Sequence, residues 1–111
     1  MQYNKLVRDK IIEIIELNGE KPVSHILNDD EYRDELVKKL KEECQELLEA
    51  IEKNNRDEIV EESADLMEVI CSINKLQESN FDDIIKVMKE KREKRGGLIL
   101  VPVKYSLNKN I

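Results

Sequence analysis

The chain has 111 residues, which is enough for one domain and too few for two well-formed cores. Charged residues and apolar residues each make up 40% of the chain, whereas aromatic residues make up 4%. With only three glycines and two prolines, this composition is typical of long helices. It excludes an all-β barrel and a dinucleotide-binding α/β domain, both of which need more glycine and more turns. The net charge of −6 argues against nucleic acid or an anionic membrane as the main partner.

The charge is unevenly distributed along the chain. Residues 1–85 hold 11 Lys and Arg against 23 Asp and Glu, whereas residues 86–111 hold 8 against 2. No signal peptide precedes the first charged residues, and no apolar run approaches the roughly 18 residues of a membrane span, so a cytoplasmic protein is expected. In that compartment Cys44 and Cys71 are expected to be small buried thiols rather than a disulfide.

Hydrophobic residues three and four positions apart predict four helices. The helices are expected over Val7–Leu17, Asp29–Lys53, Arg56–Glu78 and Phe81–Lys94. The tight turn at Asn54-Asn55 forces the second and third helices into an antiparallel hairpin. After Gly96-Gly97, the β-branched segment 98–105 predicts a short strand or an extended arm, which Pro102 confines to an edge. The expected fold class is therefore all-α: a helical hairpin with short flanking helices and a C-terminal extended arm.

Each helix of the hairpin carries acidic residues in its apolar face. Measured from Leu40 at about 100° per residue, the apolar face of the second helix extends about 80° to either side. Glu43 lies inside this arc at about −60°, and Glu46 lies at its edge at about −120°. Glu62 and Asp65 take the same two positions on the third helix. The antiparallel hairpin would bring these four carboxylates near one point.

Such a cluster is unfavourable without a counter-charge, because like charges repel and a buried unpaired carboxylate costs on the order of several kcal/mol. A divalent cation removes the conflict, since hard oxygen ligands at this spacing suit Mg²⁺, with Mn²⁺ as an alternative. A di-iron or zinc site does not fit, because neither helix carries a histidine. The competing interpretation is that the acids pair with Lys or Arg at the edge of a bundle, where Lys39 is the nearest base.

Basic residues near both ends of the chain are candidates for holding phosphates on such a cation. One group lies near the N-terminus, and the other lies at the end of the fourth helix. The candidate phosphate-binding residues are Lys5, Arg8, Lys91, Arg92, Lys94 and Arg95. For the second group, the alternative is a solvated helix end that interacts favourably with the helix dipole.

The acidic pattern resembles that of a known group of enzymes. Glu42-Glu43-Cys-Gln-Glu46, followed by Glu62-Ser-Ala-Asp65, resembles the EExxE…ExxD signature of the all-α nucleoside triphosphate pyrophosphohydrolases. The opening Tyr3-Asn-Lys-Leu-Val-Arg-Asp-Lys10 and the later Lys94-Arg-Gly-Gly97 resemble a MazG-like subgroup that is often described as phosphoribosyl-ATP pyrophosphohydrolase-like. The resemblance covers nearly the whole chain.

The resemblance implies Mg²⁺-dependent hydrolysis of a nucleoside triphosphate, or of a related triphosphate such as phosphoribosyl-ATP, between the α and β phosphates. The products are a monophosphate and pyrophosphate. The implied metal ligands are Glu43, Glu46, Glu62 and Asp65. Glu46 could also orient the attacking water, and Glu42 would have at most a supporting or cross-subunit role in catalysis.

The resemblance also implies a single domain over residues 1–111 that assembles into a homodimer or homotetramer. Its hairpins would then form a four-helix bundle, which agrees with an apolar arc too wide for one partner helix to cover. The alternative function is a non-catalytic helical-bundle interaction module. The base and sugar of the substrate stay open at this point.

Overall fold

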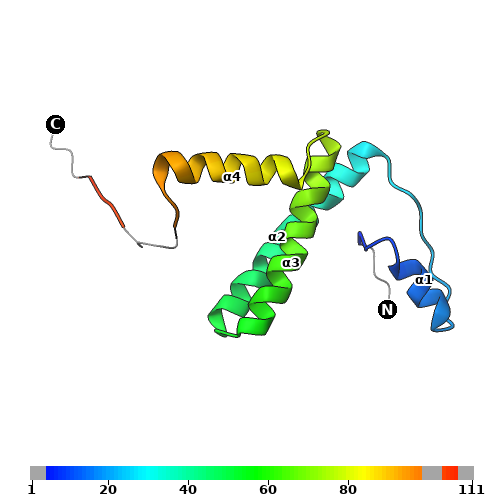
Figure 1. Cartoon of the computed structure of the whole chain (residues 1–111). Helices are drawn as coiled ribbons and strands as arrows, with labels where there is room; N and C mark the ends of the chain where they lie inside the picture. Colours follow the sequence, from blue (N-terminus) through cyan, green and yellow to red (C-terminus); the bar gives the residue numbers. More distant parts are fainter. Residues whose placement is uncertain (1–4, 99–103, 108–111) are drawn as a thin grey trace. The chain divides into compact units, whose positions relative to one another are not determined.

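The computed structural model describes residues 5–98 and 104–107 of the chain. Over these ranges the secondary structure consists of helices: α1 (Ile11–Leu17), α2 (Asp29–Glu52), α3 (Arg56–Leu76) and α4 (Phe81–Arg95) (Figure 1). The described ranges contain no strand, which confirms the predicted all-α class. The strand or arm predicted over residues 98–105 falls largely on residues 99–103, which lie outside the described residues. No helix in the described ranges is long and apolar enough to cross a membrane.

The chain divides into two compact units, residues 1–79 and residues 80–111. The first unit contains α1, α2 and α3, and the second contains α4. Within the first unit, α2 and α3 lie side by side and form the predicted antiparallel hairpin (Figure 1). The most deeply buried apolar residues all lie in this hairpin: Leu36, Ala50 and Val69.

Asparagine side chains set the beginnings of the three longer helices. The Asn28 side chain accepts a hydrogen bond from the backbone N–H of Glu31, whose carboxylate accepts one from the backbone N–H of Asn28. Asn80 and Asp83 form the same reciprocal capping box at the start of α4. Each box satisfies two backbone donors that the helix itself leaves unpaired. The beginnings of α2 and α4 therefore follow from local sequence, as predicted.

Two helix boundaries differ from the prediction by more than one residue. The first helix begins at Ile11 rather than Val7, and Lys10 at its start provides no side-chain cap. The third helix ends at Leu76 rather than Glu78, because Glu78 adopts the left-handed backbone conformation with φ of 56°. A residue in that conformation cannot continue a right-handed helix.

The hairpin buries only one side of the apolar face of α2. Leu36 and Ala50 lie against α3, whereas apolar residues about 60–160° away from these two around α2 stay open to solvent. The expectation that both thiols are buried was therefore wrong for this chain by itself: Cys44 is exposed and Cys71 is partly buried. A single partner helix covers one side of a wide apolar arc, and Cys44 lies on the other side.

Candidate metal centre

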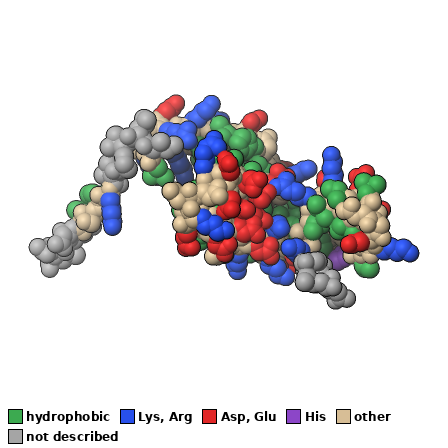
Figure 2. Space-filling view, turned by 90° about the horizontal axis from the view of Figure 1, so that it is seen from below, with side chains coloured by type: hydrophobic (Ala, Val, Ile, Leu, Met, Phe, Trp, Pro, Cys, Tyr) green, Lys and Arg blue, Asp and Glu red, His purple; other side chains and the backbone are tan. Residues whose placement is uncertain are grey.

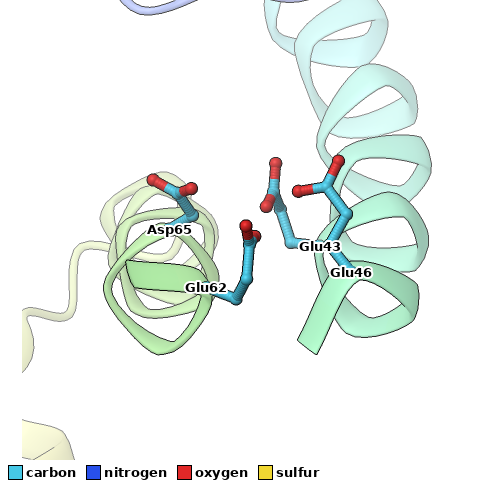
Figure 3. Close-up of side chains that lie close together, drawn as sticks. All are labelled: Glu43, Glu46, Glu62 and Asp65. Carbon is cyan, nitrogen blue, oxygen red and sulfur yellow. The ribbon is translucent and has the colours of Figure 1, made fainter. Parts of the chain in front are cut away.

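Four carboxylates from the two hairpin helices converge on one point. Glu43 and Glu46 extend from α2, and Glu62 and Asp65 extend from α3, with their side chains close together (Figure 3). One oxygen from each residue lies within 4.8 Å of the others. The structure therefore brings together the four acids that the helical wheel selects.

This convergence follows from helix geometry. Residues three positions apart are neighbours on a helix surface, so each helix presents its two acids as an adjacent pair. When two antiparallel helices face each other, equivalent positions on their helical wheels lie on the same side of the pair. Both acidic pairs therefore lie on the same side of the hairpin. Acidic side chains cover much of the central surface in the view from below (Figure 2).

Two carboxylate oxygens in the cluster are buried without a partner. Oε2 of Glu43 and Oε2 of Glu62 are out of contact with solvent and accept no hydrogen bond. The Glu43 side chain is only 7% exposed. A buried acceptor without a donor loses the free energy of its hydration, so this arrangement leaves two oxygens ready for a cation.

The donor set fits a small divalent cation. All four side chains supply hard oxygen donors, and Mg²⁺ binds such donors at about 2.1 Å. Two oxygens on opposite sides of one Mg²⁺ are therefore about 4.2 Å apart, close to the 4.8 Å limit observed here. Small side-chain adjustments would bring these oxygens to coordination distance.

Crowding of these acids changes their ionisation. Burial raises the pKa of Glu43, and its hydrogen bond and charge interaction with Glu46 raise it further, while Lys39 acts in the opposite direction. A hydrogen bond with Glu62, followed by burial, raises the pKa of Glu46. In both residues the protonated form is favoured because the carboxylates lie close together and partly away from water. A cation bound among them would reverse this preference.

Two basic residues reach the cluster, so the ion-pair alternative is partly realised. Lys39 Nζ lies 3.6 Å from Oε1 of Glu43 and 3.8 Å from Oε2 of Glu42. Arg8 Nη2 lies 2.6 Å from Oδ1 of Asp65. Among the residues that the structure describes, no salt bridge reaches Glu46 or Glu62. The basic residues therefore neutralise part of the cluster and leave the rest for another cation.

The other candidate residues lie outside the cluster. Glu42 is exposed, and its charged partner is Lys39. Lys5 is also exposed and lies three positions before Arg8 in the same non-helical segment. The remaining candidates are exposed residues at the C-terminal end of α4, in the second unit: Lys91, Arg92, Lys94 and Arg95.

Reasoning from the sequence did not find the contact between Arg8 and Asp65. Arg8 stood out as a candidate for phosphate, but its partner lies 57 positions away on α3. No periodicity spans such a separation. The only signal in the sequence was the resemblance of the segment around Arg8 to a subgroup motif.

Comparison with known proteins gives one match. The family model of the MazG nucleotide pyrophosphohydrolase domain matches residues 32–97, which include all four acids of the cluster. No curated protein and no solved structure matches the chain. The family match covers more than half of the chain and agrees with both the helical hairpin and its carboxylates. This chain therefore belongs to the MazG nucleotide pyrophosphohydrolase domain family.

Proposed function

We propose that this protein hydrolyses a nucleoside triphosphate between its α and β phosphates, releasing a monophosphate and pyrophosphate. The observation that carries the proposal is the convergence of Glu43, Glu46, Glu62 and Asp65 within 4.8 Å. The family match supports nucleotide pyrophosphohydrolase activity in general and the use of a divalent cation. We propose that residues 1–111 form a single functional domain; the family match, which covers residues 32–97, includes parts of both units.

We propose that the four acids hold Mg²⁺, with Mn²⁺ as a substitute. The bound cation would neutralise phosphate charge in the transition state and lower the pKa of a coordinated water. Glu46 is the most exposed of the four acids and carries a raised pKa, both of which suit a group that also orients the attacking water. Glu42 lies outside the cluster, so any role in catalysis would be indirect or toward a neighbouring subunit.

Basic side chains would hold the phosphate chain on the cation. Arg8 lies at the edge of the cluster through its contact with Asp65, and Lys5 precedes it by three residues. A guanidinium group can bind two phosphate oxygens at once, which suits Arg8 to this role. We propose the same role for the basic end of α4, Lys91, Arg92, Lys94 and Arg95, whose cationic side chains extend into solvent.

The substrate is identified by a panel of triphosphates. Purified protein is incubated with Mg²⁺ and canonical, deoxy and modified nucleoside triphosphates, together with phosphoribosyl-ATP, and the products are separated. Release of pyrophosphate together with the monophosphate supports the proposal, and removal of Mg²⁺ by a chelator should abolish it. Release of orthophosphate and a diphosphate contradicts the proposed cleavage position. No turnover on any compound, together with no Mg²⁺ binding by calorimetry, favours the non-catalytic interaction module.

We also propose that the protein assembles through the exposed apolar face of its hairpin. This face is formed by residues of both helices that are 45–57% exposed: Val37, Leu48 and Ile51 on α2, and Val60 and Met67 on α3. On the helical wheel these residues lie about 80–180° away from the acids of the same helix. A second copy that packs on this face would complete a four-helix bundle and leave both acidic clusters accessible, in a homodimer or a homotetramer built from such dimers.

A further inference from the structure

Arg8 ties the segment before α1 to the acidic cluster. Its Nη2 donates a hydrogen bond to Oδ1 of Asp65 across 57 positions of the sequence. By contrast, outside the acidic cluster the side-chain hydrogen bonds among the described residues of α2, α3 and their caps join positions at most five apart. Arg8 belongs to no helix, because α1 begins three residues later at Ile11. The guanidinium can therefore leave Asp65 without disturbing the hairpin.

The two basic residues at the cluster, Lys39 and Arg8, differ in how firmly the fold holds them there. Lys39 lies on α2 one turn before Glu43, so the helix that carries the acid also holds Lys39 in place. Arg8 approaches from a separate segment, and its side chain is 58% exposed while that of Asp65 is 41% exposed. An ion pair this exposed is weak and exchangeable, since water screens it and competes for both partners.

The net charge of the cluster shows how the ion pair between Arg8 and Asp65 would affect cation binding. Four ionised carboxylates against Arg8 and Lys39 leave a formal charge of −2. One divalent cation would neutralise that charge. Asp65, however, cannot give its full charge both to a guanidinium and to a divalent cation, because the two positive groups repel each other across one carboxylate.

We propose that Arg8 is the resident counter-ion of the cluster and competes with the divalent cation for Asp65. This inference rests on the proposed metal centre and adds its regulation. While the cation is absent, Asp65 holds Arg8 and stabilises the segment before α1. When the cation is bound, the guanidinium is released and becomes available to phosphate oxygens. Phosphate binding by Arg8 is thereby coupled to prior occupation of the metal centre.

The test measures binding of Mn²⁺ alone, without nucleotide, by titration calorimetry. Arg8→Ala should increase the affinity for Mn²⁺ about two- to fivefold, the range expected when a partly exposed ion pair no longer competes. Arg33→Ala is the matched control, because Arg33 pairs with the exposed Asp30 at 3.8 Å on the first turn of α2, away from the four acids. This control should leave Mn²⁺ affinity unchanged.

Hydrogen exchange separates competition for Asp65 from a general effect of charge. In the wild-type protein, Mn²⁺ should accelerate backbone amide exchange in residues 5–17, because the anchor at Asp65 is lost. In Arg8→Ala, exchange in this segment should be fast with or without Mn²⁺. Arg33→Ala removes the same charge elsewhere, so in this variant Mn²⁺ should still accelerate amide exchange in residues 5–17, as in the wild type.

The outcomes distinguish this inference from the function on which it rests. If the wild-type protein does not bind Mn²⁺, the metal centre itself is wrong. If the wild-type protein binds Mn²⁺ but Arg8→Ala binds it equally or more weakly, the competition is overturned and the metal centre stands. The same conclusion follows if Mn²⁺ leaves amide exchange in residues 5–17 unchanged in the wild-type protein.

Discussion

At the scale of single residues, the buried oxygens of Glu43 and Glu62 are the most informative atoms of the molecule. Neither Oε2 has a hydrogen-bond donor, although both belong to side chains that face other carboxylates. Such an arrangement opposes folding and persists where a ligand makes use of it. The four acids are therefore expected to lower the stability of the metal-free protein while they are needed for the proposed activity.

Glu62→Gln should separate the two effects. The substitution removes one of the four charges and keeps the shape of the side chain, so activity should fall at least about 100-fold. The metal-free protein should be as stable as the wild type or more stable, because one repulsion among buried acids is gone. Turnover of the best triphosphate from the panel and unfolding in denaturant with a chelator present measure the two quantities.

Glu61→Gln is the matched control for this substitution. Glu61 is the adjacent residue, is exposed, and lies outside the cluster of four acids. Its substitution removes the same charge from the same helix and should leave turnover nearly unchanged. Full activity in Glu62→Gln would show that the reaction takes place elsewhere on the protein.

The raised pKa values of Glu43 and Glu46 predict an unusual dependence of stability on pH. Between the ordinary pKa of a glutamate and the raised value in the folded protein, the folded state binds more protons than the unfolded chain. The contribution of these two residues to the free energy of unfolding should therefore be greatest at the acidic side of this window. It should be lost as the pH rises through the raised pKa values.

This pH dependence is measured by denaturant unfolding of the metal-free protein, compared with Glu43→Gln. The variant should gain stability relative to the wild type as the pH rises toward neutral, and the difference should shrink on acidification. Added Mn²⁺ should stabilise the wild type more at neutral than at acidic pH, because the metal binds the deprotonated acids. A difference that is independent of pH would contradict the raised pKa of Glu43.

At the scale of elements, three helices end in the same way with different residues. Gly19, Asn54 and Glu78 each follow the last turn of a helix with a positive φ, of 84°, 53° and 56°. In each case the next residue donates its backbone N–H to a carbonyl five positions back, as in a Schellman motif: Glu20 to Ile15, Asn55 to Ala50 and Ser79 to Asn74. Glycine tolerates this conformation without strain and asparagine tolerates it well, whereas glutamate does not.

Glu78→Gly should therefore stabilise the protein by about 0.5–1 kcal/mol, since relief of the left-handed strain outweighs the added freedom of the unfolded chain. Chemical denaturation measures this change. Glu61→Gly, in the exposed interior of α3, is the contrasting control and should cost about 1 kcal/mol. Equal destabilisation by both substitutions would show that Glu78 is not strained in solution.

At the scale of the whole molecule, the uncovered apolar face of the hairpin decides the proposed assembly. Side chains such as Leu48 and Ile51 are more than half exposed in the single chain, beside the exposed thiol of Cys44. Apolar area of this kind, continuous along two helices, is typical of an interface rather than of a solvent-exposed surface. Its coverage by a second copy would also bury Cys44, as the sequence led us to expect.

Leu48→Glu should dissociate the assembly, because it places a charge within the proposed apolar interface. Light scattering on a size-exclusion column should show a dimer or tetramer for the wild type and a monomer for the variant at micromolar concentration. Gln45→Glu is the matched control, since Gln45 is exposed on the same helix, outside the apolar face, and gains the same charge. A monomeric wild-type protein would contradict the proposed assembly.

The sequence by itself determined the helices and the position of the four acids. Asn28 and Asn80 act through hydrogen bonds to residues three positions away, so the beginnings of α2 and α4 follow from local sequence. The convergence of the acids also follows locally, because spacing along each helix and one short turn between the helices suffice.

Only the tertiary structure decided which charges and apolar faces meet. The pairing of Arg8 with Asp65 depends on the path of the chain between two residues 57 positions apart, and helical periodicity carries no information over such a distance. The apolar arc of α2 is broad enough for α3 to pack against it at more than one position. The exposure of Cys44 therefore depends on which position α3 takes. Local hydrogen bonds set the elements, whereas packing and long-range charge set their contacts.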